Sequence, residues 1–196
     1  MDFRSIKHIA VLSALLYSMG AGAETARGYF ELAGSLYNPD WELRENATGL
    51  RLSGAWLVTD KLRIRGTYNT ADTDFVDLPI RELRGLPFGN WREAGVAYVH
   101  PVGSKTRLDL ELSYQGVELA GDIESGSGVS VGIQHIFDQR FSGSLRFGWF
   151  DLDGSDTRLT GELLTQIGSN VALVTRIDDT AGFDFTWYEV GLRFRF

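Results

Sequence analysis

Hydrophobic and polar positions alternate through most of the chain. The stretch WYEVGLRFRF, residues 187–196, places apolar or aromatic side chains at every even position, with mostly charged or small residues between them. Alternation with a period of two is typical of a β-strand that has one apolar and one polar face. The pattern therefore predicts a strand over these ten residues.

The same alternation predicts about ten strands, with eight as the alternative number. The predicted spans are Tyr29–Leu36, Gly49–Val58, Leu62–Tyr68, Glu93–Tyr98, Arg107–Tyr114, Val129–Phe137, Phe141–Trp149, Arg158–Ile167, Val171–Ile177 and Trp187–Phe196. Within these spans, no Asp, Glu, Lys or Arg falls on the apolar face. The segregation predicts an all-β protein whose strands separate an apolar surface from a charged one.

Short and longer connections alternate between the predicted strands. The short ones are 59–61, 101–105, 138–140 and 168–170, and the longer ones are 37–48, 70–91, 115–128, 151–157 and 178–185. Short turns at one end and longer loops at the other are typical of an up-and-down antiparallel transmembrane β-barrel.

A soluble exported barrel, with its apolar face inward, would give the same alternation. The aromatic residues of the apolar face separate the two hypotheses, because they gather near the strand ends, as in the girdles at membrane interfaces. They are Trp56, Tyr68, Tyr98, Tyr114, Phe137, Phe141, Trp149, Tyr188 and Phe196. This placement favours a membrane barrel whose apolar face meets lipid.

The first 23 residues, MDFRSIKHIAVLSALLYSMGAGA, have a different pattern. A basic start, a short apolar stretch and an Ala-Gly-Ala ending are typical of a cleaved secretory signal peptide. An uncleaved amphipathic helix fits this ending less well. We expect cleavage before Glu24 and an exported barrel domain over residues 24–196.

Composition narrows the function classes. A formal net charge of −7 argues against a nucleic-acid partner. The chain has no cysteine, so it has neither a disulfide framework nor a thiolate metal site. Its mean hydropathy of −0.11 resembles that of a soluble protein, since alternation averages the two faces.

Charged residues of both signs occupy the face predicted to line the lumen. They are Glu31, Arg51, Arg63, Arg65, Glu93, Arg107, Asp109, Glu111, Arg146, Arg158, Glu162, Arg176, Glu189, Arg193 and Arg195. A barrel of eight to ten strands is narrow enough for side chains to fill. We expect paired charges in a largely filled lumen; a narrow passage, favouring anions, is the alternative.

The ending GLRFRF resembles the C-terminal signal of Gram-negative outer-membrane proteins, and GVAYVHPVGSKTRLDLELSY resembles a strand–turn–strand unit of small, largely uncharacterised members of that class. The resemblance extends over residues 27–196. It implies a monomer in contact with outer-membrane lipid and lipopolysaccharide. It also implies recognition by the barrel-assembly machinery through Tyr188, Val190, Leu192, Phe194 and Phe196.

Catalytic and metal-binding patterns are weak. After signal cleavage only His100 and His135 remain, both predicted near the short turns, whereas enzymes of this barrel class use a histidine toward the outer rim. The segment from Asp151 to Asp156 carries three carboxylates, but Asp-Gly is a common turn former and the spacing is not that of an EF-hand. We expect no enzymatic activity, no cofactor and no metal.

The connection 70–91 is the longest and is unusually apolar. Its candidate contact residues are Phe75, Val76, Leu78, Ile80, Leu83, Leu86 and Phe88. They would cap the barrel mouth or bind a host or surface ligand. The sequence thus predicts a structural or surface-interaction protein, with a narrow porin-like channel as the alternative.

Overall fold

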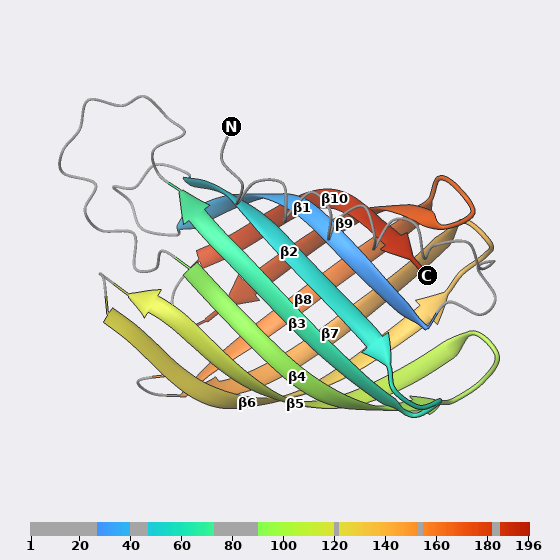
Figure 1. The fold of residues 1–196 in the computed structure, drawn as a ribbon, viewed down its shortest axis with the longest axis horizontal. Coiled ribbons are helices and arrows are strands. Elements are labelled where there is room, and N and C mark those ends of the chain that lie inside the picture. Colours follow the sequence, from blue (N-terminus) through green and yellow to red (C-terminus); the bar gives the residue numbers. More distant parts are fainter. Residues whose placement is uncertain (1–26, 40–46, 73–89, 120–121, 153–154, 182–184) are drawn as a thin grey trace, which may run out of the picture.

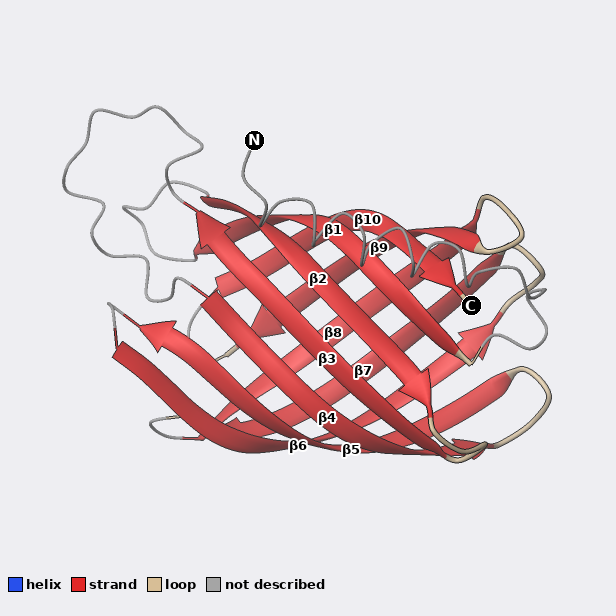
Figure 2. Cartoon of the chain, in the orientation of Figure 1, coloured by secondary structure: helices blue, strands red, loops and turns tan. Residues whose placement is uncertain are grey.

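A computed structural model describes residues 27–39, 47–72, 90–119, 122–152, 155–181 and 185–196. These residues form ten antiparallel strands that close into one barrel (Figure 1), without helices (Figure 2). The strands are β1 (Gly28–Pro39), β2 (Ala47–Leu57), β3 (Leu62–Asp72), β4 (Asn90–Pro101), β5 (Thr106–Leu119), β6 (Asp122–Ile136), β7 (Phe141–Asp151), β8 (Ser155–Gln166), β9 (Val171–Thr180) and β10 (Phe185–Arg195). Each pairs with its neighbours in sequence, and β1 pairs with β10, which confirms the predicted barrel and strand number.

Four short connections, 58–61, 102–105, 137–140 and 167–170, lie at one end of the barrel, which we call the turn end. Gly28 and Phe196 meet there, each backbone N–H donating to the other's carbonyl at 3.0 and 3.1 Å. The C-terminus therefore closes the seam at the turn end (Figure 1). The opposite end, where the other five connections leave the strands, is the loop end.

The predicted long loop 115–128 is wrong. β5 and β6 continue through most of it and pair in register, with Gln115 opposite Gly126 and Glu118 opposite Ile123. About half of each of the segments 151–157 and 178–185 is also strand. Near the loop end Gly and Ser interrupt the apolar alternation, but the backbone of these residues still completes its hydrogen-bond ladder with the neighbouring strand.

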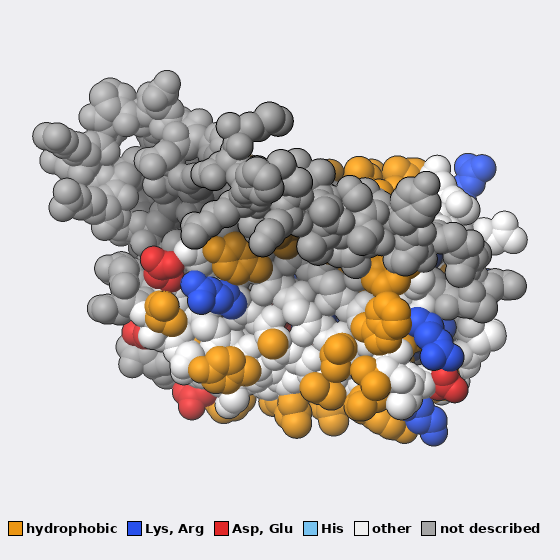
Figure 3. Space-filling model, viewed as in Figure 1, with side chains coloured by type: hydrophobic (Ala, Val, Ile, Leu, Met, Phe, Trp, Pro, Cys, Tyr) orange, Lys and Arg blue, Asp and Glu red, His pale blue; other side chains and the backbone are white. Residues whose placement is uncertain are grey.

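The outer face of the barrel is apolar. Along β4 the side chains alternate between buried and exposed, with Val96 48% exposed on the outside. Hydrophobic side chains cover much of the wall that is visible in Figure 3, and charged side chains lie toward the two ends. The predicted girdle residues Trp56, Tyr68, Tyr98, Tyr114, Phe137, Phe141, Trp149 and Tyr188 are exposed, and Phe196 is half-buried. So large an apolar surface is typical of a wall that contacts lipid.

Charged side chains return to the outward row at the loop end. Arg92, Glu118, Asp151 and Asp179 lie there, beyond the continuous apolar belt. The Arg92 guanidinium carbon lies 6.0 Å from the centre of the Tyr68 ring. Aromatic and charged groups at one level are characteristic of a membrane–water interface.

Among the described residues, no helix is long and apolar enough to cross a bilayer.

Candidate functional site

Arginines and carboxylates inside the barrel form one continuous chain of ion pairs, which we call the luminal network. Its order is Arg193, Glu31 with Glu162, Arg176, Glu189, Arg51, Asp178, Arg158, Glu93, Arg65, Glu111, Arg146, Asp109 and Arg63. Nine strands contribute to it, and β6 adds the Ser130 hydroxyl, which accepts from Arg146 at 2.9 Å. Seven arginines therefore meet seven carboxylates, so the network is neutral within itself.

Arg176 is the most connected member of the luminal network. Its guanidinium contacts Glu31 at 2.7 Å and Glu162 at 2.5 Å, and it also bonds Glu189. Arg193 binds Glu31 and Glu162 from the other side, at 2.5 and 2.7 Å. Glu31 and Glu189 are almost completely buried. Because an uncompensated buried charge costs several kcal/mol, each member holds its neighbours in place.

Glycines on neighbouring strands leave room for two of the carboxylates. A Cβ atom on Gly95 would lie 2.7 Å from Oε1 of Glu111, and one on Gly132 would lie 2.5 Å from Oδ1 of Asp109. Both distances are shorter than real Cβ contacts, so any side chain at either glycine would displace the carboxylate beside it. The network therefore depends on small residues beside its carboxylates as well as on its charges.

Three aromatic side chains meet inside the loop-end half of the lumen. The Trp91 ring of β4 contacts Phe150 of β7 and Trp187 of β10 edge-on, with ring centroids 5.5 and 5.4 Å apart. All three side chains are at most 1% exposed. Since β4 and β10 lie on different sides of the barrel, the contact bridges its interior. We call these residues the aromatic plug.

Little space remains in this half. The Arg158 guanidinium lies 5.5 Å from the Trp91 ring centre, and Val117 is fully buried. A small cavity in this half, lined by Gln115 and Phe150 among others, measures about 10 Å³. That is room for about one water molecule. Among the described residues, the aromatic plug and its neighbours therefore fill much of the loop-end half.

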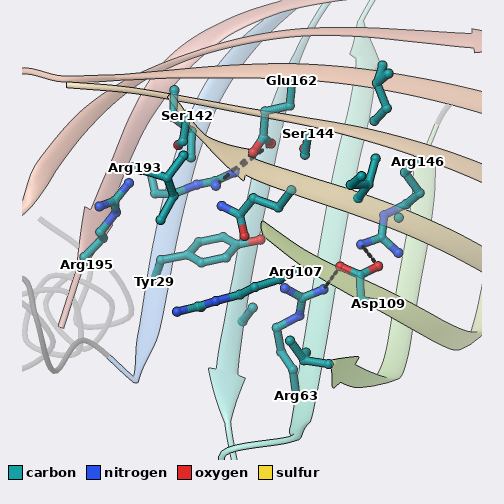
Figure 4. A pocket seen from close by; sticks show the side chains of 18 of the residues that line it. Tyr29, Arg63, Arg107, Asp109, Ser142, Ser144, Arg146, Glu162, Arg193 and Arg195 are labelled. Atoms are coloured by element: carbon teal, nitrogen blue, oxygen red, sulfur yellow. Dashed lines mark hydrogen bonds and ion pairs between the residues drawn. The ribbon is translucent and has the colours of Figure 1, made fainter. Parts of the chain in front are cut away.

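The turn-end half contains a cavity of about 350 Å³, which we call the vestibule. It begins among the turn residues 138–140 and reaches inward to Arg51 and Arg176. Figure 4 shows Arg63 and Arg146 on either side of Asp109, and Arg193 against Glu162. The expectation of a largely filled lumen therefore fits the loop-end half better than the turn-end half.

Most predicted luminal residues lie in the luminal network, but Arg107 and Arg195 do not. Both line the vestibule, and neither makes an ion pair among the described residues. Asp178, which joins Arg51 to Arg158, was missed because 178–185 was predicted to be a loop. Asp178 is two residues after Arg176 and so lies on the same face of a strand, which is the feature of the sequence that could have located it. The plug residues also follow the inward parity of their strands.

The remaining candidates are peripheral. Tyr188, Val190 and Leu192 face outward, and Phe194 and Phe196 are half-buried, with the Phe196 ring centroid 5.5 Å from that of Trp56. Phe75, Leu78, Ile80, Leu83, Leu86 and Phe88 lie outside the described residues.

The two histidines lie on the outward row near the turn end. His100 stacks on Tyr98, and His135 shares a 2.8 Å hydrogen bond with the Thr106 hydroxyl. Within the described ranges, no group of three or more His, Asp or Glu side chains is arranged to hold a metal ion. Asp153 and Gly154, in the acidic segment from Asp151 to Asp156, are not among the described residues.

No protein-family model matches the sequence, and a search of curated proteins finds no match. Among solved structures, NanC porin is similar with a TM-score of 0.50 and 10% identity, over 85% of this chain and 100% of that one. KdgM porin in complex with disordered oligogalacturonate gives 0.47 and 11%, over 85% and 99%. Neisserial surface protein A gives 0.37 and 13%, over 86% and 97%. At these identities the NanC likeness shows the fold alone, which is that of outer-membrane β-barrels.

Proposed function

We propose that the chain is a non-enzymatic outer-membrane barrel whose lumen is closed, with a structural or surface-interaction role. The observation that supports this most is the aromatic plug, because Trp91, Phe150 and Trp187 bridge the lumen from three strands. The luminal network adds buried ion pairs from nine strands inside the same barrel. A solute that crosses the barrel from either end would have to displace both.

The proposal assigns the turn end to the periplasm and the loop end to the cell surface, as in other barrels with short periplasmic turns. The apolar belt would contact lipid, and the charged row at the loop end would lie among lipopolysaccharide headgroups. The outward row that ends in Phe194 and Phe196 would be recognised by the barrel-assembly machinery of a Gram-negative bacterium. A host or surface ligand would bind the connections of the loop end. Recovery of the chain with soluble periplasmic proteins after cell fractionation would contradict this placement.

Recordings in planar lipid bilayers test the closed lumen. The refolded wild-type barrel is expected to give no reproducible unit conductance steps, since the aromatic plug bridges the lumen in the described part of the chain. Protease protection of the same preparation in vesicles shows that it has inserted, and an open porin in the same bilayer shows that the recording detects a pore. Reproducible unit steps from the inserted wild-type barrel would contradict the proposal.

A narrow anion channel is the second candidate. The vestibule favours it, because this cavity already reaches about half-way into the lumen and its walls are rich in arginine. Current that reverses at the anion equilibrium potential in a salt gradient would support the channel. Such a result would mean that the plug moves aside in the membrane.

A further inference from the structure

The vestibule has an unusual charge. Twelve Lys or Arg residues and only three Asp or Glu residues line it. One of the three, Asp138, has an oxygen that already accepts hydrogen bonds from the backbone N–H groups of Arg140 and Phe141, at 2.6 and 2.8 Å. The other two, Asp109 and Glu162, belong to the luminal network. The walls are therefore strongly cationic.

The luminal network does not remove this excess. It is neutral within itself, but only two of its seven carboxylates line the vestibule, while all seven of its arginines do. Glu31, Glu111 and Glu189, for example, lie behind the guanidinium groups that they bind. The vestibule therefore meets the positive ends of these pairs.

Cations outside the luminal network add to the positive charge of the vestibule. Arg107 enters from β5 and Arg195 from β10, and neither makes an ion pair among the described residues. Figure 4 shows Arg107 extending into the cavity near Tyr29, and Arg195 lying beside Arg193. Arg27 and Lys105 stand at the entrance. Like charges brought together in a cavity with low-dielectric walls concentrate counter-ions there.

We propose that the vestibule is a binding site for a small soluble anion that carries two or more carboxylate or phosphate groups, and that it admits this anion from the turn end only. A volume of about 350 Å³ suits such a molecule, since ligand pockets range from about 300 to 1,000 Å³. Guanidinium groups bind both kinds of oxyanion with paired hydrogen bonds. Arg107 and Arg195 supply the uncompensated charge, and the aromatic plug makes the site a dead end.

Isothermal titration of the full refolded barrel in a neutral detergent tests the site, with citrate and pyrophosphate as probes and glucose as the uncharged control. We expect wild-type barrel to bind at least one of the two anions, more weakly as NaCl is raised, and not to bind glucose. The double variant Arg107→Gln/Arg195→Gln should bind the anion about a hundredfold more weakly, from about tenfold for each charged contact. Neither residue belongs to the luminal network, so the variant should fold.

A matched variant controls for net charge. Lys61→Gln/Arg92→Gln removes the same two charges from an exposed turn and from the outer face, and it should bind as the wild type does. Heat-modifiable mobility on gels confirms that each variant is folded. Binding lost only in the Arg107/Arg195 variant supports the site, and citrate or pyrophosphate preference identifies its chemistry. Absence of binding to both anions, or equal binding by both double variants, overturns it.

The outcome is separable from that of the conductance recordings. A conducting barrel that binds the anion would overturn the closed lumen and the one-sided entry, and would keep the anion site. A barrel that gives no conductance steps and binds neither anion would keep the closed lumen and overturn the vestibule site.

Discussion

Replacing Arg176 with methionine is expected to lower the free energy of unfolding of the barrel by about 3–5 kcal/mol, the cost of breaking a buried ion pair by removing one partner. Arg176 contacts Glu31, Glu162 and Glu189, and its removal leaves the luminal network with one carboxylate in excess. Arg193 and Arg51 still hold these carboxylates, but no cation replaces the missing one. Glu31 and Glu189 are almost completely buried, so the excess charge stays poorly compensated.

Denaturant unfolding in lipid vesicles, followed by tryptophan fluorescence, measures the effect. Arg195→Met is the matched control, because it removes the same side chain from a luminal position of β10 that makes no ion pair in the described structure. It should change the free energy of unfolding by less than about 1 kcal/mol. Equal losses in the two variants would show that the ion pairs of Arg176 contribute nothing particular.

Placing an arginine on the apolar belt is expected to have the second largest effect. Val96 lies at the middle of β4, between Leu112 of β5 and Ile64 of β3, and all three side chains are exposed. Val96→Arg should lower the free energy of unfolding in vesicles by about 2–4 kcal/mol, as expected for arginine near the bilayer midplane. Val102→Arg, in the exposed turn 102–105, should cost at most about 1 kcal/mol.

The pair of valines gives the experiment its control, since both start from the same residue and both are exposed. The difference should appear in vesicles of ordinary thickness and should shrink in a thinner bilayer that brings water nearer to residue 96. If the two variants unfolded alike, the outer wall at Val96 would not lie in hydrocarbon.

The parity of the strands could be read from the sequence because lipid and lumen impose opposite chemistries on neighbouring residues. Each of the ten predicted spans overlaps a strand, and Arg51, Arg65 and Glu93 all point inward as their parity predicts. The pattern weakens near the loop end, where the outward row leaves the apolar belt and residues such as Glu118 and Asp179 occupy it. That is why the strand pairing over 115–128 and the role of Asp178 were missed.

The interior arrangement needed three-dimensional information. Parity places Arg107 and Arg193 on the inward face, but it does not show that Arg193 has two ion-pair partners and Arg107 has none among the described residues. Which charges meet depends on how far each strand is offset along the barrel relative to the others. The network includes contacts across the lumen, such as Arg51 with Asp178 and Arg158 with Glu93. The same offset brings Trp91 against Trp187 and leaves the vestibule open in the turn-end half.

The most direct test of the central assignment, that the apolar row faces hydrocarbon, uses the absence of native cysteine. Single variants Val96→Cys, Leu112→Cys and Val102→Cys can each carry one nitroxide label in vesicles. Electron paramagnetic resonance should then find the labels at 96 and 112 accessible to oxygen and shielded from a water-soluble nickel chelate, with the reverse at 102. Labels at 96 and 112 that are immobilised and shielded from oxygen, or as accessible to nickel as the label at 102, would contradict the assignment.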